Sequence, residues 1–180
     1  MMDPADEQRR QAALDGLHLL RLAHERWSAT QRELGSPELT PENRREFTLR
    51  LYGDAINVLV WARGLDDFCS AKNGPVAGYA AARPGMAATL DGARFACAHA
   101  IHQLGVTAQA VSGLVDPLIG PLTTRSRVRW AAAELLPDDE RRARGRTSYT
   151  QTLAKRDIAP TLDRLVDWFE HLIGSAADTP

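Results

Sequence analysis

The chain has 180 residues, of which 44% are apolar and 25% are charged, and its formal net charge at pH 7 is −1. These values are close to the averages for globular proteins. They exclude a collagen-like chain, a wholly disordered chain and a disulfide scaffold, and they predict a single domain over residues 1–180. Because the net charge is near zero, any attraction to nucleic acid or membrane must be local.

Two long amphipathic helices are predicted in the first part of the chain. Residues 5–34 place apolar side chains at three- and four-residue steps, and Gly35-Ser36-Pro37 ends the pattern. A second helix opens at Thr40-Pro41, where threonine is a suitable N-cap and proline suits the first helical position. Asn73-Gly74-Pro75 ends it. Its apolar stripe is wide, so we expect this helix to be central, with neighbours on more than one side.

Two further helices are predicted from the same periodicity, over residues 86–104 and 158–173. Pro160 suits the first turn of the last helix. Residues 74–85 are rich in Gly and Ala and are predicted to be a connection. The tail after Ser175 is expected to fray.

The segment 106–148 has no single regular pattern. Residues 106–114 are predicted to form a short helix, and residues 128–136 fit either a strand or a helix, because periodicity does not separate the two. Residues 137–148 are predicted to be a charged loop. The sequence therefore predicts a mainly α fold, an antiparallel helical bundle with an irregular 106–148 segment.

A long neutral run lies in the middle of the chain. From Phe95 to Thr124 the only formally charged residue is Asp116. A run this neutral is expected to be core, partner interface or both. We therefore predict a homodimer with the 86–104 helix at or near its interface.

The cysteines and the termini bear on the compartment. Cys69 and Cys97 lie in apolar helical surroundings, where free cysteine behaves as a small buried hydrophobe, and two cysteines are too few for a cysteine zinc site. No apolar run approaches the ~18 residues of a membrane helix, and the polar N-terminus lacks the core of a signal peptide. We expect a cytoplasmic protein without membrane association, cofactor or metal.

The segment with most chemical potential is Leu90 to Gln103, which carries Arg94, His99 and His102 on three turns of one helix. Cleavage of RNA needs a base for the 2′-hydroxyl, an acid for the leaving oxygen and a cation for the phosphorane. Histidine supplies the first two and arginine the third. Two plainer interpretations remain open: the histidines are polar residues on a half-exposed face, or the i,i+3 pair holds a metal, for which no nearby Asp, Glu or Cys completes a set.

The stretch LYGDAINVLVWARGLDDFCSA, followed by a loop and the LDGARFACAHAIHQL helix, resembles the HEPN superfamily of helical domains over about residues 45–105. Many members are metal-independent ribonucleases, often toxins or defence effectors. They dimerise and build the active site across the dimer from an R-x4–6-H pattern. The resemblance implies a HEPN-like RNA- or nucleotide-binding domain, a weakened metal-independent endoribonuclease of toxin or defence type, with an antitoxin-like protein as a partner.

Two alignments with the family pattern are open. Read literally, Arg94 and His99 satisfy R-x4-H, with Phe95 in place of the usual polar neighbour. Aligned on Ala-Ile-His-Gln, His102 becomes the family histidine and Cys97 stands at the arginine position. The second alignment fits the apolar spacing better and implies impaired catalysis. The resemblance thus implies Arg94, His99 and His102 as catalytic candidates.

A second candidate feature is the cluster Arg141, Arg142, Arg144 and Arg146, which an RNA backbone could use as a positive site. The plainer interpretation is a solvated loop balanced by Asp138, Asp139 and Glu140. The alternative function for the whole chain is a non-catalytic helical interaction or scaffold protein, acting as a homodimer or as a partner-binding subunit.

Overall fold

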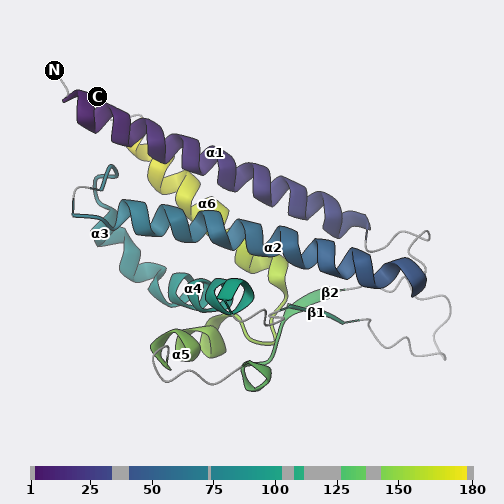
Figure 1. The fold of residues 1–180 in the computed structure, drawn as a ribbon. Coiled ribbons are helices and arrows are strands. Elements are labelled where there is room, and N and C mark those ends of the chain that lie inside the picture. Colours follow the sequence, from purple (N-terminus) through teal and green to yellow (C-terminus); the bar gives the residue numbers. More distant parts are fainter. Residues whose placement is uncertain are drawn as a thin grey trace.

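The computed structural model describes residues 3–33, 41–72, 74–102, 108–111, 127–136 and 143–177. The described part is mainly helical, as predicted (Figure 1). Its elements in chain order are α1 (Pro4–Glu33), α2 (Pro41–Cys69), α3 (Tyr79–Ala82), the 3-10 turn η1 (Arg83–Gly85), α4 (Ala87–His102), β1 (Ala108–Val111), β2 (Arg127–Trp130), the 3-10 turn η2 (Ala133–Leu135), α5 (Ala143–Thr152) and α6 (Ile158–Ala177).

Helix α2 is the centre of the bundle, in agreement with its wide apolar stripe, because it packs against α1, α4 and α6 (Figure 1). Antiparallel packing against α1 brings Leu65 against Gly16 at one end, while Thr30 donates a hydrogen bond to Asp54 at 2.7 Å near the other. Helix α6 also runs antiparallel to α1, since Arg21 pairs with Glu170 and His24 lies 2.8 Å from Asp163. These three helices share the main core.

Helices α4 and α5 form a second, antiparallel pair beside α2. Their close approach depends on Gly92, because an added Cβ there would lie 2.8 Å from Thr152 Oγ1 and 3.2 Å from the Tyr149 backbone. Tyr149 is fully buried, and its hydroxyl donates to the Ala131 carbonyl at 2.7 Å. Helix α5 is therefore anchored on both sides, against α4 and against the segment after β2.

The strands correct one prediction. Residues 108–111 belong to β1, where the sequence pattern predicts a short helix over 106–114, and β1 pairs antiparallel with β2, with Ala108 opposite Trp130. Trp130 is fully buried, and its indole Nε1 donates to Thr161 on α6 at 3.2 Å. This contact with a distant helix holds the strand in place, and the local sequence pattern gives no sign of it. The 128–136 segment is therefore a strand followed by a 3-10 turn.

A second correction concerns the charged loop predicted at 137–148. Residues 137–142 lie outside the described part of the chain, and the residues from 143 onward form α5, whose only buried residue is Tyr149. A ten-residue helix with one buried side chain has no periodic stripe of apolar residues from which it could be predicted. Its stability comes from packing against α4. The last helix extends beyond its predicted end, to Ala177. None of the described helices combines the length and apolar character needed to cross a membrane.

We predict that Gly92→Ala destabilises the fold by about 1 kcal/mol or more, because the methyl group would force α5 away from α4. Gly53→Ala is the matched control. It also replaces a helical glycine, but its Cβ meets nothing within 4 Å, so higher helix propensity should stabilise the chain by about 0.5–1 kcal/mol. Urea denaturation of both variants measures the difference, and an equal effect at the two glycines would contradict the close packing of α4 and α5.

Candidate functional site

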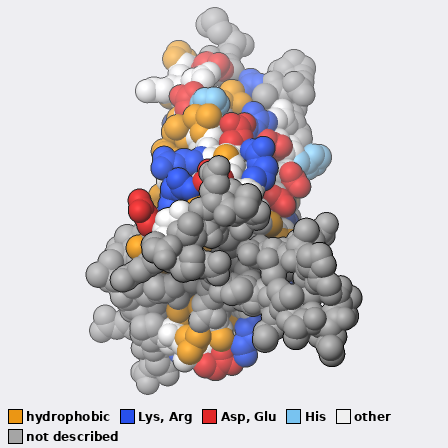
Figure 2. Space-filling view, turned by 90° about the vertical axis from the view of Figure 1, so that its right-hand side faces the viewer, with side chains coloured by type: hydrophobic (Ala, Val, Ile, Leu, Met, Phe, Trp, Pro, Cys, Tyr) orange, Lys and Arg blue, Asp and Glu red, His pale blue; other side chains and the backbone are white. Residues whose placement is uncertain are grey.

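A pocket of about 450 Å³ opens where α2, η1, α4 and α5 meet. Its described lining combines cationic and apolar side chains: Arg63, Arg83, Asp91, Arg94, Phe95, Ala98, Arg144 and Gly145. Four guanidinium groups thus accompany one carboxylate in this lining. On the described part of the face shown in Figure 2, Lys and Arg lie interspersed with Asp and Glu. Asp66 and Asp67 also pair with these arginines, so the cluster holds four guanidinium groups and three carboxylates and keeps a small positive charge on a chain whose net charge is −1.

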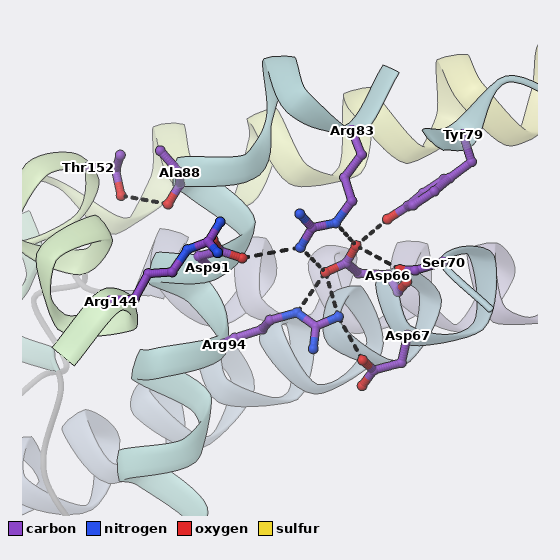
Figure 3. A network of polar contacts seen from close by, with 10 residues as sticks. All are labelled: Asp66, Asp67, Ser70, Tyr79, Arg83, Ala88, Asp91, Arg94, Arg144 and Thr152. Carbon is purple, nitrogen blue, oxygen red and sulfur yellow. Dashed lines mark hydrogen bonds and ion pairs between the residues drawn. The ribbon is translucent and has the colours of Figure 1, made fainter. Parts of the chain in front are cut away.

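The arginines are held by Asp66, a fully buried carboxylate on α2 (Figure 3). Arg83 donates to it in bidentate fashion, from Nε to Oδ1 at 2.9 Å and from Nη2 to Oδ2 at 3.2 Å. Arg94 reaches Oδ2 from α4 at 2.6 Å. The Tyr79 hydroxyl also donates to Oδ1, and the Ser70 hydroxyl donates to the backbone carbonyl of Asp66. One carboxylate therefore ties together α2, α3, η1 and α4.

Burial by itself would raise the pKa of the Asp66 carboxyl. Hydrogen bonds from Arg83, Tyr79 and Arg94 outweigh this effect and hold the pKa below its ordinary value of 3.8. Burial, with the hydrogen bond to Asp66, also raises the pKa of the Tyr79 hydroxyl. The network is thus ionised at Asp66 and neutral at Tyr79 throughout the physiological range.

Two further carboxylates form an outer ring around this network. Asp67 accepts from Arg94 Nη2 at 2.6 Å, and Arg63 Nε lies 3.5 Å from its other oxygen. Asp91 on α4 accepts from Arg83 Nη2 at 3.1 Å, and Arg144 Nη2 lies 3.5 Å from its second oxygen. The four arginines are therefore not equivalent.

Arg83 and Arg94 are tightly bound to carboxylates, whereas Arg63 and Arg144 are loosely bound. Arg63 is 39% exposed and Arg144 is 86% exposed, and each has a single ion pair to a described residue, at 3.5 Å. A guanidinium carries five N–H donors, so these two have donors to offer a ligand in the pocket. They come from α2 and α5, so a ligand between them would bridge the two helices.

The structure places the predicted site residues unevenly. Arg94 lines the pocket, but its guanidinium is engaged by Asp66 and Asp67. The backbone of His99 and His102 lies in the last turns of α4, and their side chains lie outside the described part of the structure. Cys97, the arginine position in one family alignment, is 1% exposed, and burial raises the pKa of its thiol. That position points into the core.

The arginine-rich cluster is also divided. Arg144 lines the pocket, whereas Arg146 turns the other way and donates to the Ala133 carbonyl at 3.1 Å. Arg141 and Arg142 lie outside the described residues. The cluster is thus not one uniform positive loop, since of its two described members only Arg144 lines the pocket.

Sequence analysis missed Arg63, Arg83, Asp66 and Asp91. A signal for Asp66 was present, because it directly follows Leu65 and precedes Cys69 on the buried side of the second helix. A carboxylate on a buried face needs a cationic or hydrogen-bonding partner. No local pattern names that partner, because Arg83 and Arg94 come from other segments. Among the described side chains, no three His, Cys, Asp or Glu residues group closely enough to hold a metal ion.

Comparison with known proteins gives no family assignment: no family model, no curated protein and no solved structure matches this chain.

We predict that Asp66→Asn lowers the free energy of unfolding by about 3 kcal/mol or more, because it removes the anion from a buried ion-pair cluster. A lowered folded-state pKa contributes stability above the unfolded value of 3.8, and this stability disappears as pH falls through the lower folded value. The free energy of unfolding of the Asp66→Asn variant should lack this pH-dependent contribution. Urea denaturation between pH 7 and pH 2 measures both effects. Asp67→Asn, at a half-exposed carboxylate, is the control and should cost about 1 kcal/mol or less.

Proposed function

We propose that the chain is a HEPN-like domain that binds RNA or nucleotides, with a phosphate group held in the arginine pocket. The observation that supports this proposal is the lining itself, in which four arginines from three helices and the η1 turn accompany one carboxylate among the described residues. Arginine binds phosphate oxygens in bidentate fashion, because its planar guanidinium presents two parallel N–H donors.

Arg63 and Arg144 are the phosphate ligands in this proposal. Among the described residues, Arg63 is paired with Asp67 and hydrogen-bonded to Cys97, and Arg144 is paired with Asp91, which leaves donors on both guanidinium groups, whereas Arg83 and Arg94 are held by Asp66. Phe95 and Ala98 add apolar lining next to the arginines. A pocket that combines charge with apolar surface suits a nucleotide, which carries a phosphate and a base, better than a bare inorganic anion.

The proposal includes a weakened, metal-independent ribonuclease activity of toxin or defence type. Arg94 has the role of a positioning residue, because its guanidinium is shared between Asp66 and Asp67. His99 and His102 follow the pocket-lining residue Ala98 on α4, and in this proposal they supply the base and the acid.

The proposal also includes a cytoplasmic homodimer with an antitoxin-like protein as partner. Phe95 to Ala98, the residues of the neutral run whose burial the structure describes, are buried within the monomer and supply no free apolar surface for a dimer.

We predict that Arg63→Gln/Arg144→Gln weakens binding of a single-stranded oligoribonucleotide about 10- to 100-fold, because each charged hydrogen bond contributes about 1.5–3 kcal/mol and the remaining arginines compensate in part. The slope of log affinity against log salt should fall in magnitude by about 0.7 for each phosphate that the variant no longer neutralises. Fluorescence anisotropy at several salt concentrations measures both quantities.

The matched control for this variant is Arg9→Gln/Arg32→Gln on α1. It removes the same charge from two residues that do not line the pocket. If the control lowered affinity as much as the pocket variant, binding would depend on net charge alone and the pocket assignment would be wrong. If the wild-type chain bound no RNA or nucleotide, the helical interaction protein would be the better description.

If the domain cleaves RNA, cleavage should persist in a chelator and leave a 2′,3′-cyclic phosphate, since the 2′-hydroxyl would be the nucleophile. His102→Ala should then lower the rate about 100-fold or more, the usual contribution of a general acid or base. Product analysis by mass spectrometry tests the chemistry. Persistence of the full rate in the His102 and His99 variants would exclude these residues from it.

A further inference from the structure

Asp91 is the one carboxylate among the described residues that line the arginine pocket. A carboxylate in the wall of a phosphate site repels the ligand's charge and competes for the arginines, and a phosphate site gains from it only where it orients an arginine. The contacts of the two Asp91 oxygens therefore need to be considered separately. Its salt bridge to Arg83 gives part of the answer, since Arg83 fixes one of its oxygens at 3.1 Å.

The second oxygen of Asp91 is held differently. Its contact is with Arg144 Nη2 at 3.5 Å, and Arg144 is 86% exposed, so this pair is weak and open to a competing ligand. Figure 3 shows the contact of Asp91 with Arg83, and the Arg144 side chain reaches the same carboxylate from α5. The pocket thus presents a fixed hydrogen-bond acceptor directly beside an exposed guanidinium that can bind phosphate.

We propose that Asp91 accepts a hydrogen bond from the ribose 2′-hydroxyl next to the phosphate bound by Arg144, so that the pocket selects RNA over DNA. In RNA the 2′-hydroxyl is on the carbon adjacent to the one that bears the 3′-phosphate. An arginine and a carboxylate in contact with each other are therefore spaced to take the two groups together. The 2′-hydroxyl is the group by which a protein can distinguish RNA from DNA at one site. This inference rests on the proposed function and adds sugar specificity to it.

The test compares affinities for RNA and DNA oligonucleotides of the same sequence. We expect the wild-type chain to bind RNA about tenfold or more tightly than DNA, the effect of one hydrogen bond to a charged acceptor. Asp91→Ala should bring this ratio close to one. The ratio is the informative quantity, because removing an anion from the pocket raises the affinity for both nucleic acids and that shared gain cancels.

Asp67→Ala is the matched control. It removes the same charge from the same arginine cluster, but Asp67 does not line the pocket. Its ratio of RNA to DNA affinity should therefore stay at the wild-type value. Circular dichroism establishes that both variants are folded, and gel analysis after each titration establishes that the RNA is intact.

A ligand with 2′-fluoro ribose tests the inference without any change to the protein. Fluorine keeps the ribose pucker of RNA and removes the donor hydrogen, so the wild-type affinity should fall to about that of DNA. Equal affinity of the wild-type chain for RNA and 2′-fluoro RNA, or an Asp91→Ala variant that keeps the wild-type ratio, would overturn the inference. In both cases the arginine pocket would still be supported if Arg63→Gln/Arg144→Gln weakened binding. Absence of any RNA binding would overturn both proposals together.

Discussion

The buried ion pairs of Asp66 with Arg83 and Arg94 are the interaction on which the pocket depends. Asp66 is completely buried in the central helix, and a carboxylate in that position is stable only with charged and hydroxyl donors around it. These donors come from α3, η1 and α4, so satisfying one carboxylate fixes the connection after α2 and the start of α4. The same contacts direct two guanidinium groups toward the pocket.

Much of the helical fold could be predicted from the sequence, and the helix that completes the site could not. The four long helices have apolar stripes that identify them without tertiary information. Helix α5 buries only Tyr149, and its stability depends on Gly92 of α4, which lies far earlier in the chain. The β1–β2 pair likewise depends on Trp130 reaching Thr161 on α6. A helix or strand that is stabilised by residues far away in the sequence has little apolar periodicity of its own from which it could be predicted.

The candidate site shows the same division. Local arginine patterns identify Arg94 and Arg144, and both line the pocket, but their carboxylate partners cannot be inferred from those patterns. Arg94 is bound to Asp66 and Asp67, which makes it part of the framework, whereas the one ion pair of Arg144 to a described residue is a long contact with Asp91. The number of charged residues along a sequence does not distinguish an arginine such as Arg94 from one such as Arg144. The two differ in how many of their N–H donors are bound by surrounding carboxylates.

The arginines bound to Asp66 and the proposed ligand arginines, Arg63 and Arg144, differ in how they respond to ionic strength. Salt at physiological concentration screens exposed charges beyond about 8 Å and affects buried pairs much less. The pairs of Asp66 are buried, while Arg144 is almost fully exposed. Raising the salt concentration therefore weakens attraction of a phosphate toward Arg144 and leaves the Asp66 network in place. If the pocket binds phosphate as proposed, folding and binding use the same cluster of charges but respond differently to salt, because only binding depends on exposed guanidinium groups.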